Sequence, residues 1–408
     1  MGISMLYRVS YIILLFLVSF TAIQAQRKPL VEEGKTGLYS GYKFPKAVKK
    51  DRYRIAVISS LYLDSLELEK VMTHMPKLMQ QGIDFIKGVE IAADTLNRMG
   101  MDLNIHIFDS RSDSLPVEEL ISKKILDTMD LVIGNVSGSD LSALASFASE
   151  HSINFISVTS PADASQTSNP YFTILHPRLV SHIEKIHRNI NYRYPEDNVV
   201  FVYRNSAAEK NALNYFKSDV LNELPGRFSA FEMKGDELDL FQLLKTIDTN
   251  YHTTFVLGIL DPAVTHKVLK QLTPYSKPYG FKAYCMPTAE NIKSLGKTDE
   301  FPDLIVYYTT PYVIDKITPA SLYISREYRR IMGGYVSDIV YKGFESVYFF
   351  ASLLKKYGVP FNDHMGDNAW SFITPYKIVP VKDKGQIRYY ENKYLYILRF
   401  ENGILTYE

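Results

Sequence analysis

The chain has 408 residues, a length that suggests two or three domains of ordinary size. Hydrophobic residues make up 46% and charged residues 22%, which are proportions typical of a globular protein with a substantial core. Lys and Arg number 46 against 45 Asp and Glu, so no basic excess is present to bind a phosphate backbone, and nucleic acid is not an expected partner.

The first 25 residues have the pattern of a secretory signal peptide. Arg8 precedes an apolar run over residues 11–20, and small and polar residues then lead to Ala25 and Gln26. The run is too short for a comfortable transmembrane helix, which needs about 20 apolar residues. We expect cleavage after Ala25, a periplasmic location and no membrane span in the mature chain; an uncleaved anchor is the alternative.

The one cysteine and the segment after the signal pattern both bear on the folded part. Cys285 has no second cysteine to pair with, so the core must stabilise the exported chain without a disulfide, which suits a bacterial periplasm. Its apolar surroundings favour a buried, inert thiol over a reactive one. Residues 26–52 are basic and punctuated by Gly and Pro, and are expected to form a linker. The folded part is expected to start at Tyr53.

From Tyr53 onward, short apolar runs alternate with segments of helical periodicity. The predicted strands are residues 54–58, 103–108, 131–133, 155–158, 199–203, 228–232, 254–259 and 304–308. The predicted helices are residues 82–98, 118–127, 141–150, 179–191, 209–224, 238–248, 263–272, 323–332 and 341–357. This alternation predicts an α/β protein with doubly wound parallel sheets.

The C-terminal tail has a different pattern. Residues 378–381, 387–390 and 394–400 alternate as antiparallel strands do, with turn signals at 383–385 and 402–403.

The sequence carries no motif for catalysis, metal binding or phosphate binding. It contains no GxxxxGK[ST] loop and no GxGxxG after a strand. Ser137 follows Gly134 by three residues, whereas a nucleophile elbow places Gly two residues before the Ser. His182 and His187 are five residues apart, so on a helix they point to different faces. We therefore expect a non-enzymatic protein without a metal or cofactor.

The segment from Gly134 to Asp140 is a candidate binding loop between a strand and a helix. Small hydroxyl residues and free N–H groups at a helix N-terminus present donors to a carboxylate or another polar ligand. Ser139 or Asp140 can also cap the following helix, and the two roles are compatible.

Several segments together resemble the type I periplasmic binding proteins, a family that includes branched-chain amino-acid-binding proteins and receptor ligand-binding regions. Gly88, Ala92, Asn97 and Gly100 mark a helix that leads to a strand ending at Asp109, as in that family. Further matching segments are residues 132–138, 155–160, 169–172, 307–312, 328–334 and 341–347. The resemblance covers residues 53–408. The polar segment at 61–81 is similar to relatives in Bacteroidetes-type bacteria, some of which carry a LysM module that residues 27–50 are too few to form.

The resemblance implies two Rossmann-like lobes joined by three crossovers, near residues 176–177, 310–311 and 373–375. Lobe one would then comprise residues 53–176 and 311–374, and lobe two residues 177–310 and 375–408. Ligands in open α/β sheets bind at the loops that follow the carboxyl ends of the strands. The expected ligand-binding residues are Ser59, Ser60, Ser137, Gly138, Ser157, Thr159, Ser160, Tyr203, Asn205, Asp261 and Thr288.

The resemblance further implies capture of a small polar ligand, amino-acid-like or peptide-like, in a cleft that closes by hinge motion, for uptake through an ABC permease. Residues 206–209 read Ser-Ala-Ala-Glu where amino-acid binders have a Tyr-Gly pair. After the strand at Cys285, no carboxylate occurs until Glu290 to hold a ligand ammonium, and an unpaired buried ammonium is costly. The alternative is a non-transport interaction or regulatory module of the envelope, linked to peptidoglycan, because activators of peptidoglycan synthases use a related lobe.

Overall fold

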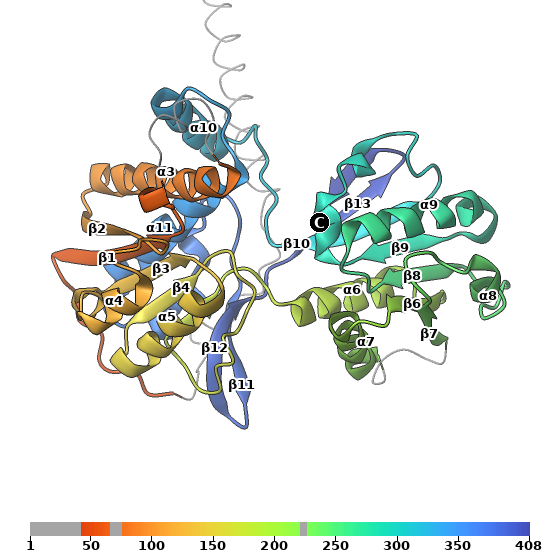
Figure 1. Ribbon diagram of the computed structural model, residues 1–408, viewed down its shortest axis with the longest axis horizontal. Coiled ribbons are helices and arrows are strands. Elements are labelled where there is room, and N and C mark those ends of the chain that lie inside the picture. The colour runs from red at the N-terminus through yellow and green to blue at the C-terminus, as the bar shows by residue number, and fades with distance from the viewer. Residues whose placement is uncertain (1–41, 66–75, 221–226) are drawn as a thin grey trace, which may run out of the picture. The chain divides into compact units, whose positions relative to one another are not determined.

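The computed structural model describes residues 42–65, 76–220 and 227–408. Within these residues, fourteen strands form two sheets of seven strands each, and helices flank both sheets (Figure 1). The predicted signal peptide, most of the predicted linker and part of the polar segment at 61–81 lie outside the described residues.

The first sheet has the strand order β11-β12-β5-β4-β3-β1-β2. Its pairs are parallel except for the β11–β12 hairpin. Because β1 lies between β2 and β3, the strand order reverses beside β1, and such a switch point is where open α/β sheets bind ligands. The strands are β1 (Arg52–Ser59), β2 (Asp102–Asp109), β3 (Leu131–Asn135), β4 (Asn154–Ser157), β5 (Phe172–Ile174), β11 (Ile378–Asp383) and β12 (Gln386–Asn392).

Helices cover both faces of the first sheet, and the sheet with these helices is called the first lobe. Successive residues of a strand point to opposite faces, so Ile133 of β3 packs in one core and Val132 in the other. The helices of the first core are α3 (Lys77–Arg98), α10 (Pro319–Met332) and α11 (Asp338–Tyr357). The helices of the second core are α4 (Val117–Ser122) and α5 (Gly138–His151).

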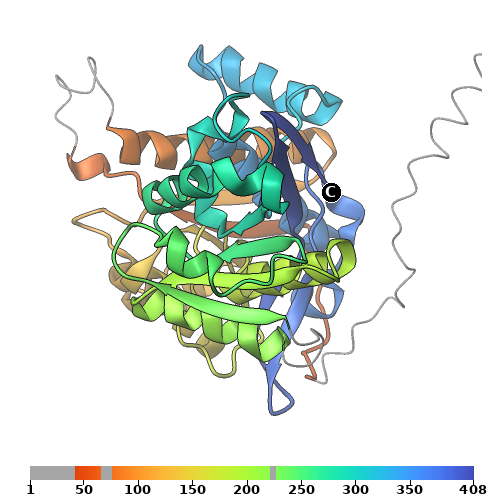
Figure 2. The ribbon, with the colours of Figure 1, turned by 90° about the vertical axis from the view of Figure 1, so that its right-hand side faces the viewer.

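The second sheet has the order β14-β13-β10-β9-β8-β6-β7, and here β6 marks the switch point between β7 and β8. Figure 2, in which this sheet faces the viewer, shows helices on both sides of its strands. The strands are β6 (Asn198–Arg204), β7 (Phe228–Met233), β8 (Thr253–Leu257), β9 (Lys282–Cys285), β10 (Ile305–Thr310), β13 (Tyr396–Glu401) and β14 (Ile404–Tyr407). The helices of this second lobe are α6 (Leu179–Arg193), α7 (Ala207–Val220), α8 (Leu240–Leu244) and α9 (Pro262–Tyr279).

Short 3₁₀ turns complete the described elements. They are η1 (Leu63–Ser65), η2 (Leu126–Thr128), η3 (Pro287–Asn291), η4 (Lys293–Gly296), η5 (Asn362–His364) and η6 (Asn368–Trp370).

The predicted α/β class with two doubly wound lobes is confirmed, but the third crossover needs correction. The sequence interpretation placed it at 373–375 and gave the tail from 375 to the second lobe. In the structure β12 pairs with β5, and Ile378 and Ile387 pack in the core of the first lobe. The third crossover therefore lies between β12 and β13, where the chain leaves the first sheet for the second time. The predicted helix at 238–248 is also shorter, since α8 spans Leu240–Leu244.

Candidate functional site

A pocket of about 360 Å³ lies at the switch point of the first lobe. Its volume is at the small end of the range of ligand pockets, about 300–1,000 Å³. The residues that line it lie at or just after the ends of β1, β2, β3 and β4, or in the first two turns of α3. They are Ser60, Tyr62, Gln81, Gly82, Arg111, Asn135, Val136, Ser137, Thr159, Ser160 and Pro161. This first-lobe pocket brings together four of the predicted residues, namely Ser60, Ser137, Thr159 and Ser160.

Asp109, at the end of β2, fixes the wall of the first-lobe pocket. Its carboxylate accepts hydrogen bonds from the backbone N–H groups of Leu61 and Leu63, both at 2.8 Å, and from that of Arg111 at 2.9 Å. Between the first two donors, Tyr62 has a φ of 57°, in the left-handed region that a non-glycine residue adopts at an energetic cost. The loop after β1 is thus held in shape by a buried carboxylate.

Asn135 connects the hydroxyl groups of the first-lobe pocket. Thr159 donates its Oγ1–H to Asn135 Oδ1 at 2.7 Å, and Asn135 Nδ2 donates to Ser59 Oγ at 3.1 Å. Ser59 is fully buried, so it supports Asn135 instead of lining the pocket. Ser157 is also fully buried and donates to the carbonyl oxygen of Ser160 at 3.3 Å. These two predicted residues therefore support the ones that line the pocket.

The N-terminus of α5 and Arg111 give the first-lobe pocket its positive character. Ser137 holds the N-cap position without a side-chain cap, and Gly138 begins the helix with a φ of 63°. The helix starts before Ser139 and Asp140, so the predicted capping by either residue is wrong. Arg111 Nη2 lies 3.5 Å from Asp140 Oδ2. Burial raises the pKa of the Asp140 carboxyl, while Arg111 acts in the opposite direction.

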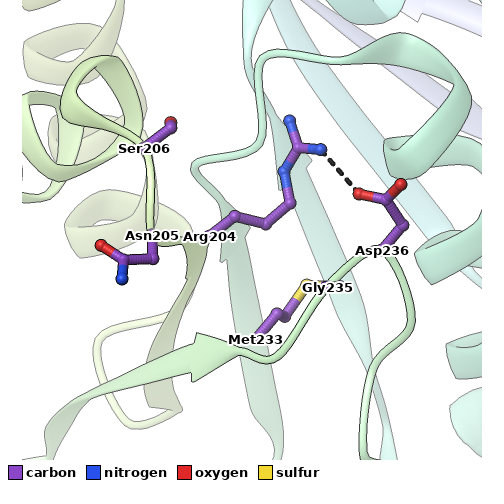
Figure 3. Close-up of a pocket in the computed structure, with 6 residues that line it drawn as sticks. All are labelled: Arg204, Asn205, Ser206, Met233, Gly235 and Asp236. Atoms are coloured by element: carbon purple, nitrogen blue, oxygen red, sulfur yellow. Dashed lines mark hydrogen bonds and ion pairs between the residues drawn. The ribbon is translucent and has the colours of Figure 1, made fainter.

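The second lobe has its own pocket, of about 350 Å³, where β6 and β7 end (Figure 3). Arg204 donates from Nη1 to Asp236 Oδ1 at 2.8 Å and from Nη2 to Glu209 Oε1 at 2.7 Å. The hydrogen bond to Glu209 is the main reason why the pKa of Arg204 is raised. Of the predicted residues, Asn205 lines this second-lobe pocket. The full lining is Arg204, Asn205, Ser206, Met233, Gly235 and Asp236.

The three other predicted residues of the second lobe do not line either pocket described above. Tyr203 donates its hydroxyl to Glu232 Oε2 at 3.1 Å. Asp261 is the N-cap of α9 and accepts from two backbone N–H groups of its first turn, so its carboxylate has a structural partner. The Oγ1 of Thr288, in η3, is buried and has no hydrogen-bond partner among the residues that the structure describes.

Sequence reasoning missed the charged members of both pockets. Arg111 follows β2, Arg204 ends β6 and Asp236 follows β7. The rule that selected the hydroxyl residues, a position after the carboxyl end of a strand, also points to these three.

Two further observations concern chemistry and membranes. Among residues 42–65, 76–220 and 227–408, no group of three or more His, Cys, Asp and Glu side chains could hold a metal ion. In the same ranges no helix is long and apolar enough to cross a membrane.

Cys285 is fully buried, as predicted, and burial raises the pKa of its thiol.

Comparison with known proteins identifies the fold. Residues 87–270 match the family model described as "Receptor family ligand binding region". No curated protein matches the chain.

Three solved structures illustrate the likeness. A putative branched-chain amino acid ABC transporter from Rhodospirillum rubrum has a TM-score of 0.65 at 12% identity, over 87% of this chain and 99% of that one. A leucine-binding protein, LivK, from Thermotoga maritima has a TM-score of 0.52 at 14% identity, over 87% and 97%. Full-length LpoA from Haemophilus influenzae has a TM-score of 0.60 at 11% identity, over 91% of this chain and 61% of LpoA. The chain thus has the type I periplasmic binding protein fold and the predicted resemblance is confirmed, whereas the Bacteroidetes-type subgroup stays a prediction.

Proposed function

Starting from the type I periplasmic binding fold, we propose that this protein is a non-enzymatic, periplasmic solute-binding protein that delivers a small polar ligand to an ABC permease. The first-lobe pocket is the observation that carries the proposal, because it gathers hydrogen-bonding groups from four strand ends at the switch point. The names of two structural neighbours, a leucine-binding protein and a branched-chain amino acid ABC transporter, support a transport role. The signal-peptide pattern at residues 1–25 supports the location.

The chemistry of the first-lobe pocket suits an acceptor-rich group, such as a carboxylate. The first turn of α5 offers N–H groups together with the positive end of the helix dipole. Arg111 adds a guanidinium whose side chain is 39% exposed and whose contact with Asp140 is long, at 3.5 Å. A charge-assisted hydrogen bond from Arg111 to a ligand carboxylate is therefore compatible with this arrangement. We infer that the second-lobe loop that holds Asn205 completes the site and that the two lobes close on the ligand by a hinge motion.

A thermal-shift screen of the chain from Gln26 tests this function. Amino acids, short peptides, sugars, carboxylates and muropeptides are the compounds, and a ligand present at 100 times its Kd stabilises the native state by about 2.7 kcal/mol. We expect a saturable rise in Tm that Ser137→Phe and Thr159→Phe abolish. Ser146→Phe is the matched control, because Ser146 lies on the exposed side of α5, the helix that Ser137 precedes, and this variant should keep the rise in Tm. A ligand shift that survives both pocket substitutions would contradict the proposed site.

A second candidate is a non-transport interaction module of the envelope, linked to peptidoglycan. The structural match to LpoA over 91% of this chain supports this candidate, because the name of LpoA carries no transporter role. The discriminating result is an absence of any shift in the screen together with saturable co-sedimentation of the purified chain with purified peptidoglycan.

A further inference from the structure

We propose that the second-lobe pocket is an anion-binding subsite, in which Asp236 holds the place of a ligand carboxylate on Arg204 until the ligand displaces it. The inference deepens the proposed function and rests on it, because it names the group that the ligand presents to the second lobe. Since Arg111 offers a guanidinium in the first-lobe pocket as well, a ligand with two anionic groups, such as a dicarboxylate, is the expected class.

Glu209 is the permanent partner of Arg204. Its side chain is 1% exposed and accepts from the backbone N–H of Arg204 at 2.7 Å, from Nε at 3.1 Å and from Nη2 at 2.7 Å. It also accepts from the backbone N–H of Leu260 at 3.2 Å, which ties the loop after β8 to the same carboxylate. A buried carboxylate with this many donors does not exchange, so the guanidinium is fixed in position and orientation.

Asp236 is held in a different way. Its side chain is 55% exposed and makes one contact with Arg204, at 2.8 Å from Nη1 (Figure 3). It follows Gly235, which has a φ of 89°, in the loop after β7. An exposed ion pair of this kind contributes little to stability and is broken at little cost. Of the two carboxylates on Arg204, one is therefore permanent and the other is exchangeable.

The groups around Arg204 can receive an incoming oxyanion. A guanidinium has five N–H donors in a planar fork that suits a carboxylate. Glu209 accepts from Nε and Nη2, and Asp236 accepts from Nη1, so Nη1 and Nη2 each keep one further N–H. Asn205 and Ser206 line the same pocket and contribute an amide and a hydroxyl. Ser206 directly precedes α7, a helix of 14 residues whose N-terminus adds partial positive charge.

The charge balance explains why Asp236 decides the affinity. Arg204 is one positive group facing two negative ones, Glu209 and Asp236. A ligand anion must therefore compete with Asp236 directly and cannot simply add to the site. Removing the charge of Asp236 while keeping its size should then strengthen binding of an anion, whereas an ordinary ligand-contacting residue would weaken binding when changed.

Titration calorimetry with straight-chain dicarboxylates of four to eight carbons, and with monocarboxylates of the same lengths, tests the inference. We expect a preference for a dicarboxylate and an affinity for it that rises about fivefold in Asp236→Asn, the size of an exposed ion pair. Glu237→Gln removes the same charge one residue further on and should change the affinity less than twofold. The double variant Arg204→Gln, Glu209→Gln avoids a buried unpaired carboxylate and should bind both acid series equally.

The outcomes separate this inference from the proposed function. If another compound binds through Ser137 and Thr159 while Asp236→Asn has no effect on any carboxylate, the solute receptor stands and the anion subsite is overturned. Weaker dicarboxylate binding by Asp236→Asn also overturns it, as does a complete lack of dicarboxylate binding by that variant. Loss of dicarboxylate preference in the double variant, together with tighter binding in Asp236→Asn, supports it.

Discussion

Replacing Glu345 with Gln should change how the stability of the protein depends on pH. Glu345 lies on α11 and is 2% exposed. Its carboxylate accepts from the backbone N–H of Ile373 at 2.8 Å, the backbone N–H of Thr374 at 2.7 Å and the Thr374 hydroxyl at 2.7 Å. Burial raises the pKa of Glu345 to about 7, although these three bonds act in the opposite direction.

The expected magnitude follows from the two pKa values. In the unfolded chain the pKa of Glu345 takes its ordinary value of 4.5. Because the folded chain holds the proton more tightly, the stability that protonation of Glu345 contributes is fully present below pH 4.5 and is lost as the pH rises through 7. The whole difference amounts to about 3 kcal/mol. Gln does not titrate, and its amide can both accept the two N–H bonds and donate to the Thr374 hydroxyl.

Urea unfolding of the wild-type chain and of Glu345→Gln at pH 5, 6, 7 and 8 measures this effect. The comparison uses the difference between the two proteins, because His176 and His182 also titrate. Burial lowers their pKa values to about 4 and about 3, so their contribution makes stability rise with pH in both proteins alike. We expect the variant to gain about 2–3 kcal/mol over the wild type between pH 5 and pH 8. A difference that stays constant over this range would refute the reasoning.

Two substitutions test the packing and the buried charge. In Gly88→Ala the new Cβ would lie 2.0 Å from the carbonyl oxygen of Val340, where α3 crosses α11, so urea unfolding should show a free energy of unfolding about 2 kcal/mol lower. The control is Gly334→Ala, whose new Cβ would have no atom within 4 Å and whose free energy of unfolding should stay within about 0.5 kcal/mol of wild type. Equal losses in both variants would contradict the argument. Asp197→Ala removes the carboxylate that lies 2.7 Å from the Lys282 ammonium and also accepts the Thr254 hydroxyl. It should cost about 3–5 kcal/mol of unfolding free energy, and the added change Lys282→Met should restore the part due to the stranded ammonium.

The fold was largely predictable because its signals are local. Buried strands such as β3 read as short apolar runs, and helices such as α3 show a clear apolar period. The turn at 383–385 was predicted correctly as a hairpin, and Lys384 and Gly385 both adopt a positive φ there. In contrast, β5 has three residues, all buried, which is too short for a period to appear, and no strand was predicted there. The four buried residues of β9 were expected as a strand only from the family resemblance.

The third crossover could not be read in the same way. An antiparallel hairpin has the same alternation whichever sheet it joins. What assigns β11 and β12 to the first lobe is the pairing of Tyr390 with Thr173, residues more than 200 positions apart in the chain. No pattern within the hairpin itself encodes that choice, whereas a turn or a helix carries its signal in neighbouring residues.

For the site, the rule of strand ends located the first-lobe pocket but did not rank its residues. Ser59 and Ser157 are the last residues of β1 and β4, and their side chains are fully buried. Ser60 and Thr159 come one and two residues later and line the pocket. A shift of one residue therefore separates a supporting hydroxyl from one that can meet a ligand.

The two lobes use a carboxylate at the switch point for different purposes, and this difference bears on the ligand. In the first lobe Asp109 accepts from backbone N–H groups and shapes a loop, and the Arg111 guanidinium makes a long contact, at 3.5 Å, with Asp140. In the second lobe Glu209 binds the guanidinium of Arg204 itself and holds it rigid. In the proposed mode of binding, the first arginine moves toward the ligand, whereas the second stays fixed and the ligand displaces Asp236 from it. Under that proposal the ligand must be anionic where it meets the second lobe, and this requirement argues against a branched-chain amino acid.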